Sequence, residues 1–160
     1  MVHGLLGSKR NFRTISNSPL LGKHLNAVHL LDLRNHGESD HTQSMTLTEM
    51  AEDLTEYITP LDNVVLLGHS LGGRVIFKYL EENGEKANNL LKGVVIVDIL
   101  PTKVESTYVL DLLNTLKKIP MENRTFNELE EDFSVAAQNK SIAQLIMTNI
   151  DSIHPITRSM

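Results

Sequence analysis

The chain contains no cysteine, and this absence excludes several kinds of chemistry at once. Disulfide bonds, a thiol nucleophile and cysteine-ligated metal sites all need that residue. No spacing of histidine, aspartate and glutamate suggests a metal site either, so we expect neither a metal nor another cofactor. The lack of cysteine is also compatible with a reducing compartment.

Long apolar runs and basic runs are missing as well. No stretch approaches the roughly 18 consecutive apolar residues of a membrane-spanning helix, and the start shows no secretory signal peptide. The 160 residues carry a net charge of −5. Because surfaces that bind nucleic acids are basic, we expect no nucleic-acid partner and no membrane span.

What the chain does contain is a serine between two glycines, at the point where an apolar run gives way to a helical pattern. Residues 64–67 read Val-Val-Leu-Leu, which is typical of a buried parallel strand, and Gly68-His69-Ser70-Leu71-Gly72 follows. The G-x-S-x-G pattern between a strand and a helix is a nucleophile elbow, in which a strained turn projects the serine from the sheet. We therefore predict that Ser70 is the nucleophile of an acyl transfer. The alternative is an ordinary turn with an incidental serine.

Strand and helix patterns alternate over residues 1–101. The first residues read as the exit from a strand, and further strands are predicted over residues 26–33, 63–67 and 93–99. Between them lie a weak, interrupted helix pattern over 9–25, a helix capped by Thr46 or Thr48 that ends near Ile58, and a helix over 71–82 closed by Asn83-Gly84. Such alternation predicts an α/β fold with a parallel sheet.

From Thr102 onward the strand patterns disappear. Helices are predicted over residues 109–116, 126–138 and 141–150. We therefore predict two domains, a partial α/β core over residues 1–101 and a helical cap or lid over residues 102–160. We expect the cap to cover the carboxyl edge of the sheet, where open α/β sheets bind their ligands.

A serine nucleophile also needs backbone donors that stabilise the oxyanion of the reaction intermediate. In an elbow, one donor is the N–H after the nucleophile, here Leu71, and the other comes from a loop after an earlier strand. The glycine-rich loop over residues 3–8 contains His3-Gly4-Leu5, so Leu5 N–H is the second candidate. The other interpretation of His3-Gly4 is a tight turn without a catalytic role.

The residues alone do not decide which carboxylate is the orienting acid of the triad. Asp98 ends the strand after the elbow helix, and it fits a triad acid and a cap of the loop before Pro101 about equally well. Asp32 also ends a strand, but the Gly37 turn after it predicts that its carboxylate bonds backbone N–H groups. We expect His36 to belong to that turn.

No histidine of the chain fits the role of the general base. In this arrangement the order is serine, acid, histidine, and of the seven histidines only His154 follows Asp98. His154 falls in the predicted cap, where a surface residue is the expected role, and His3 and His69 are expected to serve packing or loop hydrogen bonds. We therefore expect the chain to be a piece of a longer protein, with its histidine beyond residue 160, and to be inactive and poorly stable alone.

Four motifs occur in a fixed order along residues 2–101. They are HGLxGS at His3–Ser8, DxRNHGxS at Asp32–Ser39, GHSxGG at Gly68–Gly73 and VDIxP at Val97–Pro101. In these motifs the chain resembles the α/β-hydrolase superfamily, and most closely the abhydrolase domain-containing protein 11 type with its bacterial esterases and fungal ethanol acetyltransferases. The resemblance implies a parallel sheet with flanking helices, Asp98 as the triad acid and a mitochondrial location.

The resemblance also implies a substrate class. A hydrolase of this kind acts on a small ester, thioester or acyl-CoA through an acyl-serine intermediate, and this is our first prediction. The alternative is an alcohol acetyltransferase that makes ethyl acetate from ethanol and acetyl-CoA with the same triad. Both share one acyl-enzyme, so the motifs do not separate them. A third hypothesis is an inactive fragment that lacks the triad histidine.

Overall fold

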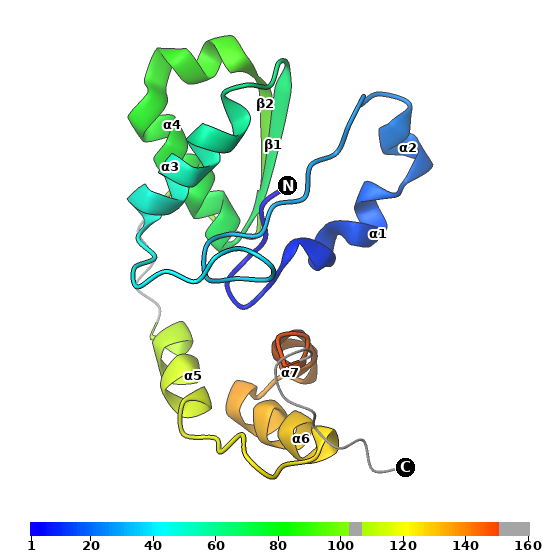
Figure 1. The fold of residues 1–160 in the computed structure, drawn as a ribbon, viewed down its shortest axis with the longest axis vertical. Helices are drawn as coiled ribbons and strands as arrows, with labels where there is room; N and C mark the ends of the chain where they lie inside the picture. The colour runs from blue at the N-terminus through cyan, green and yellow to red at the C-terminus, as the bar shows by residue number, and fades with distance from the viewer. Residues whose placement is uncertain (103–106, 151–160) are drawn as a thin grey trace. The chain divides into compact units, whose positions relative to one another are not determined.

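The chain divides into two compact units, Met1–Pro101 and Thr102–Met160. A computed structural model describes residues 1–102 and 107–150. The first unit combines parallel strands with helices, whereas the described part of the second unit is helical (Figure 1). The α/β class predicted from the alternating pattern is therefore the class observed.

A parallel strand pair lies at the centre of the first unit. Strand β1 (Val64–His69) pairs with β2 (Leu91–Val97) along its whole length. On the other side of β1, Val2 forms parallel bridges with both Gly68 and Leu31. The order across the sheet is therefore Leu31, Val2, β1, β2, and all four chain segments run in the same direction.

The predicted strand over residues 26–33 is wrong in its extent. Only Leu31 of this segment forms a bridge, because its neighbour in the sheet is the single residue Val2. A ladder needs successive paired residues on both strands, and the described chain supplies one such residue here. The predicted strand over 93–99 is displaced: β2 begins at Leu91 and ends before Asp98, whose φ of 59° leaves the extended conformation.

The segment between Val2 and Leu31 forms three short helical pieces. They are η1 (Lys9–Phe12), α1 (Arg13–Ser16) and α2 (Pro19–Gly22). The weak helix predicted over residues 9–25 is therefore present only in fragments, as its Pro19 and Gly22 indicate.

Helix α3 (Leu47–Ile58) begins where its capping residues predict. The Thr46 side chain accepts from Glu49 N–H, and the Glu49 carboxylate accepts from Thr46 N–H, which completes a capping box. Met50, Leu54 and Ile58 are buried in the core, and α3 packs against the helix over Leu71–Leu90. Spacing along the helix predicts that Tyr57 shares this buried face, and that prediction is wrong: Tyr57 is 45% exposed, and its hydroxyl lies 2.9 Å from His29 Nδ1.

Helix α4 (Leu71–Leu90) packs on β1 and against α3 (Figure 1). It buries Val75, Ile76 and Tyr79 in the core. The chain leaves helical geometry at Gly84, with φ 45° and ψ −120°, so the closure predicted at Asn83-Gly84 is confirmed, and a further helical stretch that the sequence did not predict continues to Leu90. Burial of Ala87 after the kink explains the continuation, since it adds apolar contact to the same core.

The second unit contains α5 (Tyr108–Leu116), α6 (Phe126–Ala137) and α7 (Lys140–Met147). Leu129, Phe133 and Ala137 of α6 are buried, as their spacing predicts. The Tyr108 hydroxyl donates to Ala137 O at 2.9 Å and fixes α5 to the end of α6. That this unit serves as a cap stays a prediction.

Candidate active site

The residues singled out in the sequence follow the ends of neighbouring parallel strands. His3 follows Val2, Asp32 follows Leu31, Ser70 follows β1 and Asp98 follows β2. Because parallel strands place their carboxyl ends at the same edge of a sheet, all four motifs meet at that edge. The Ser70 N–H donates to Val97 O at 2.9 Å, which fixes the elbow against the end of β2.

Ser70 has the strained backbone that an elbow requires. Its φ of 49° and ψ of −110° lie outside the regions that residues with a Cβ usually adopt. Such strain persists only where the surrounding structure enforces it, and it concentrates at functional sites. Ser70 stands directly before α4, between the strand that ends at His69 and the helix that begins at Leu71.

The two glycines of the elbow are required by close approach, as the pattern predicts. A Cβ on Gly68 would lie 2.6 Å from Gly72 O, and a Cβ on Gly72 would lie 2.3 Å from Val2 O. Both distances are far below van der Waals contact, so larger residues at these positions would push the strand, the helix and the Val2 segment apart. The glycines therefore permit the turn that exposes Ser70.

The His3-Gly4-Leu5 loop lies against the elbow. A Cβ on Gly4 would lie 3.3 Å from Ser70 Cβ and 2.9 Å from His69 Nδ1. Within the described part of the chain, neither Leu5 N–H nor Leu71 N–H donates a hydrogen bond. Both donors are thus available beside the serine, and Leu71 is also the first residue of α4, where the helix dipole favours negative charge.

Asp98 lies at the strand end that its motif predicts. Its side chain is 83% exposed, and its Oδ2 lies 3.8 Å from Nε2 of His69. The carboxylate is therefore accessible to a further partner. The sequence assigned His69 to packing or loop hydrogen bonds and did not indicate this proximity.

The described histidines near the elbow do not serve as a base for Ser70. His3 is fully buried, with Leu33 N–H donating to its Nε2 and its Nδ1 bonded to Gly4 O. His69 turns one ring nitrogen toward Gly4 and the other toward Asp98. His154 lies outside the described residues.

Asp32 has the structural role that its turn predicts. Its carboxylate, 3% exposed, accepts from Lys9 N–H at 2.6 Å and from Glu38 N–H at 3.0 Å. Burial by itself would raise the pKa of Asp32, but these N–H groups and the Lys9 ammonium lower it below its ordinary value. His36 bonds Arg34 O within the same turn, also as predicted.

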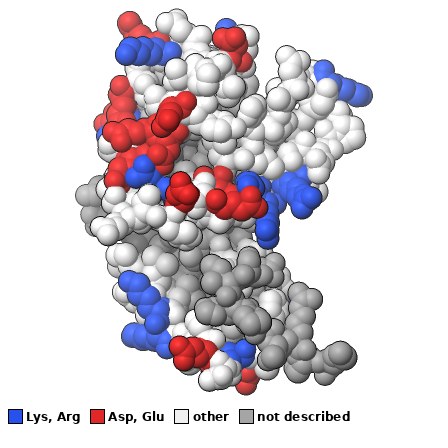
Figure 2. All heavy atoms as spheres, in the orientation of Figure 1, with Lys and Arg blue, Asp and Glu red and all other residues white. Residues whose placement is uncertain are grey.

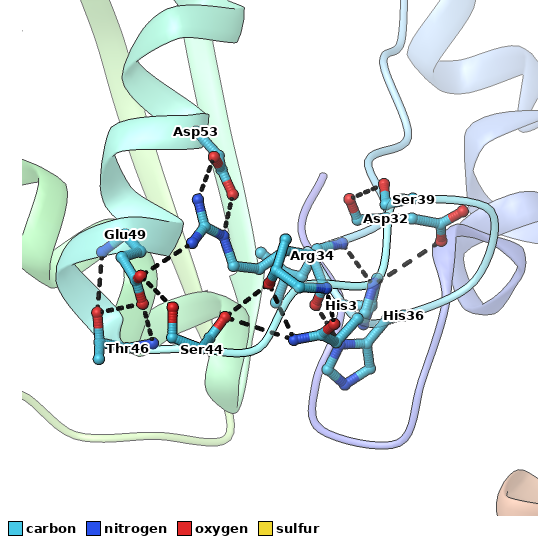
Figure 3. Close-up of polar contacts among 12 residues, drawn as sticks. His3, Asp32, Arg34, His36, Ser39, Ser44, Thr46, Glu49 and Asp53 are labelled. Carbon is cyan, nitrogen blue, oxygen red and sulfur yellow. Dashed lines mark hydrogen bonds and ion pairs between the residues drawn. The ribbon is translucent and has the colours of Figure 1, made fainter.

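Arg34 is a residue of this turn whose role the sequence did not indicate. Its guanidinium donates two hydrogen bonds to Asp53, at 2.6 and 2.7 Å, and lies 3.3 Å from Glu49. Figure 3 shows this cluster, in which Glu49 also accepts from Ser44 and Thr46. The cluster ties the Asp32 turn to the first half of α3. The acidic residues at 49 and 53, four apart on one predicted helix, were the available signal.

A hollow beside the Asp32 turn does not include Ser70. This hollow, of about 320 Å³ between residues 31–34 and α3, is lined by Leu31, Leu33, Met50 and Tyr57 among others, and Ser70 is not among its lining residues. Carboxylates gather over α3 on the face that Figure 2 shows.

The described ranges, 1–102 and 107–150, contain neither a metal-binding cluster nor a membrane-spanning helix. No cluster of three or more His, Asp or Glu side chains there is placed to hold a metal ion. No helix in these ranges has the length and apolar character needed to cross a bilayer.

The chain is similar in sequence to a protein named as a lipase and to one named as an acetyltransferase. The chain is 34% identical over 158 residues to the "sn-1-specific diacylglycerol lipase ABHD11" of Danio rerio, covering 94% of this chain and 48% of that protein. It is 36% identical over 104 residues to "Ethanol acetyltransferase 1" of Cyberlindnera fabianii, covering 64% of this chain and 30% of that protein. The chain thus spans about half the length of the Danio rerio relative, and less of the Cyberlindnera fabianii one.

A solved structure titled "Marine microorganism esterase" superposes on the chain with a TM-score of 0.80 and 32% identity. The superposition covers 92% of this chain and 57% of the esterase. The family described as the alpha/beta hydrolase fold matches residues 1–143. A match over so much of the chain, together with the elbow on a parallel strand, means that the protein belongs to the α/β-hydrolase fold family.

Proposed function

We propose that the whole protein is a serine-dependent acyl-transfer enzyme that hydrolyses small carboxylic esters or thioesters through an acyl-serine intermediate. The observation that carries the proposal is the strained backbone of Ser70 at the end of β1, between glycines that no larger residue could replace. Strain of this kind is costly for a turn without a function. Relatives named as lipases and esterases support the same reaction class.

The residues at the sheet edge have distinct roles in this reaction. Ser70 Oγ attacks the carbonyl carbon of the substrate, and its proton passes to a histidine base that Asp98 orients. The N–H groups of Leu5 and Leu71 stabilise the oxyanion. The bond to the alcohol or thiol then breaks, and the leaving group takes the proton from the base. Water attacks the acyl-serine in the second half and releases the acid.

The histidine base is assigned to the part of the protein that the described residues do not contain. The exposed Asp98 carboxylate supports this assignment, because it has room for an imidazole partner beyond His69. The helical second unit is proposed as the cap over the acyl-binding region. The mitochondrial location implied by the resemblance also stays a proposal, which fractionation of cells expressing the whole protein would test.

Labelling with a fluorophosphonate probe tests the nucleophile directly. The probe forms a covalent bond with an activated serine, so we expect it to label the whole wild-type protein and not its Ser70→Ala variant. Ser44→Ala removes an exposed hydroxyl outside the elbow and is the matched control, which should label like the wild type. Equal labelling of the Ser70→Ala variant would contradict the assignment, and no labelling of any form would favour a non-catalytic protein.

The second candidate function is acetyl transfer to an alcohol. The similarity to "Ethanol acetyltransferase 1" favours it, and the acyl-serine is shared by both reactions. The two differ in whether water or an alcohol attacks that intermediate. Incubation with acetyl-CoA, with and without ethanol, separates them: ethyl acetate formation that depends on Ser70 identifies the transferase, whereas acetate alone identifies the hydrolase. A diacylglycerol belongs among the test esters because of the Danio rerio relative.

A further inference from the structure

His3 is fully buried, and both of its ring nitrogens are bonded to the backbone. Leu33 N–H donates to Nε2 at 3.1 Å, and Nδ1 lies 2.8 Å from Gly4 O. Because a backbone amide can only donate, Nε2 must be the acceptor, and the proton of the neutral ring must reside on Nδ1. Burial also lowers the pKa of His3 below its ordinary value, which favours this neutral form.

The bond from Nδ1 fixes one particular peptide group. Gly4 O accepts from His3 Nδ1–H and, at 3.0 Å, from Gly7 N–H. The peptide bond between Gly4 and Leu5 is trans, so its N–H points away from its carbonyl oxygen. Two bonds on Gly4 O therefore set the direction of Leu5 N–H, which is the proposed oxyanion donor beside Ser70.

The corner formed by Asp32 and Leu33 holds the loop over residues 3–9 at both of its ends. At its start, Leu33 N–H holds the His3 ring, and at its end Lys9 N–H donates to Asp32 Oδ1 at 2.6 Å. Figure 3 shows His3 and Asp32 from these two segments facing each other, with Nε2 and Oδ1 at 3.8 Å. Asp32 and Leu33 are themselves held in place by the turn that follows them. The loop therefore cannot shift without breaking the hydrogen bonds of His3 and Lys9 to these two residues.

We propose that His3 is a positioning residue of the oxyanion hole, which it serves by holding the Gly4–Leu5 peptide in the orientation that presents Leu5 N–H to the reacting carbonyl. This inference rests on the proposed acyl-transfer function. An oxyanion donor stabilises the transition state only if it is oriented before the reaction. The Asp32–Leu33 corner supplies that orientation through the ring of His3, although the side chains of both residues are buried.

Two substitutions of His3 in the whole protein, one to Asn and one to Gln, test separately its bond to Gly4 O and its bond to Leu33 N–H. The short side chain of His3→Asn places its amide near the position of Nδ1 and can still donate to Gly4 O. The longer side chain of His3→Gln reaches the position of Nε2 and accepts from Leu33 N–H, but it loses the bond to Gly4 O. With a short-chain nitrophenyl ester, we expect kcat of His3→Gln to fall about 10–100-fold, since removing an oxyanion donor outright costs about 100–1,000-fold.

The accompanying measurements distinguish positioning from general loosening. We expect KM of His3→Gln to stay within about twofold, because the lost contribution acts on the transition state, and we expect His3→Asn to retain most of the wild-type kcat. His29→Asn is the control, since His29 is exposed and its Nδ1 lies 2.9 Å from the Tyr57 hydroxyl, with no bond to the Gly4 carbonyl. Nitrogen-15 NMR of histidine-labelled wild-type protein should show His3 protonated on Nδ1 only.

Several results would overturn the proposal. They are wild-type kcat in a folded His3→Gln variant, equal losses in His3→Gln and His3→Asn, or an equal loss in His29→Asn. If neither His3 variant folds, the NMR measurement decides, and a proton on Nε2 would refute the assignment. Failure of the proposed function is recognised separately: there Ser70→Ala would keep wild-type turnover, whereas an inactive Ser70→Ala beside a normal His3→Gln refutes only the role of His3.

Discussion

Asp32 and Asp98 both follow the end of a parallel segment at the same sheet edge, yet their surroundings are opposite. The Asp32 carboxylate is 3% exposed and accepts from two backbone N–H groups, whereas that of Asp98 is 83% exposed and has His69 at 3.8 Å. A carboxylate that is enclosed and bonded on both oxygens holds a turn together. One that remains open can orient a mobile or distant imidazole. The comparison indicates that the position on a strand does not decide the role of an aspartate, whereas its hydrogen-bond partners do.

Asp98→Asn in the whole protein is expected to have the largest effect on activity. Replacing the orienting acid of a serine triad lowers kcat by about 10⁴, so ester hydrolysis should fall by about that factor while the melting temperature stays unchanged. Asp62→Asn, an exposed aspartate before β1, is the control and should behave like the wild type. Turnover near normal in Asp98→Asn would place the acid elsewhere.

Asp32→Ala tests the other half of the comparison through stability. The substitution leaves the N–H groups of Lys9 and Glu38 without their acceptor, and each unsatisfied buried donor costs about 1–3 kcal/mol. We expect the free energy of unfolding to fall by about 2–4 kcal/mol in urea titrations. Asp98→Asn, which removes an exposed charge and keeps a residue type that tolerates the φ of 59° at this position, should change it by less than about 0.5 kcal/mol. Similar losses in both variants would remove the distinction between the two aspartates.

Gly37→Ala perturbs the Asp32 turn without removing the carboxylate. Gly37 has a φ of 55°, and a Cβ there would lie 2.3 Å from Asp32 Cγ, so the turn or the carboxylate must move. We expect a loss of about 1–2 kcal/mol in the free energy of unfolding, measured as above. Gly22→Ala is matched to it, because its Cβ would meet no atom within 4 Å. A Gly37→Ala variant as stable as Gly22→Ala would mean that the turn is not tightly held.

Glu49 shows what hydrogen bonding does to a carboxylate that is not buried, and a substitution there has the smallest expected effect on stability. Hydrogen bonds from Ser44 and Thr46 lower the pKa of Glu49 to about 2, from an ordinary value of 4.5, although the residue lies at the surface. A carboxylate whose pKa is lower in the folded state stabilises the fold above its unfolded pKa, and this contribution is lost as the pH falls toward the folded pKa.

Thermal unfolding of the wild type and Glu49→Gln between pH 7 and pH 2 measures that contribution. We expect the wild type to melt at the higher temperature at pH 7 and the difference to shrink as the pH falls from about 4.5 to about 2. Glu56→Gln, on the exposed side of the same helix, is the control. The prediction fails if the two variants differ from the wild type by the same amount at every pH.

The sequence by itself was sufficient for the elements and motifs that depend on near neighbours. The elbow at Ser70 is readable because the apolar run, the two glycines and the helical spacing are contiguous. The start of α3 is readable for the same reason, since Thr46 and Glu49 cap one helix end. The break at Gly84 is readable too, since Asn83-Gly84 is a local stop signal, whereas the helical stretch from there to Leu90 was not, because it depends on burial of Ala87 in the core.

Only the tertiary structure decided which side chains meet at the sheet edge. Leu33 N–H bonds His3 across 30 positions of sequence, Lys9 N–H bonds Asp32 across 23, and Arg34 bonds Asp53 across 19. Spacing along a chain predicts contacts within one helix or strand, where the geometry repeats. Contacts between segments depend on how the strands align and which loops they carry to the same edge, so the roles of His3 and Arg34 emerge only when the parallel segments are assembled.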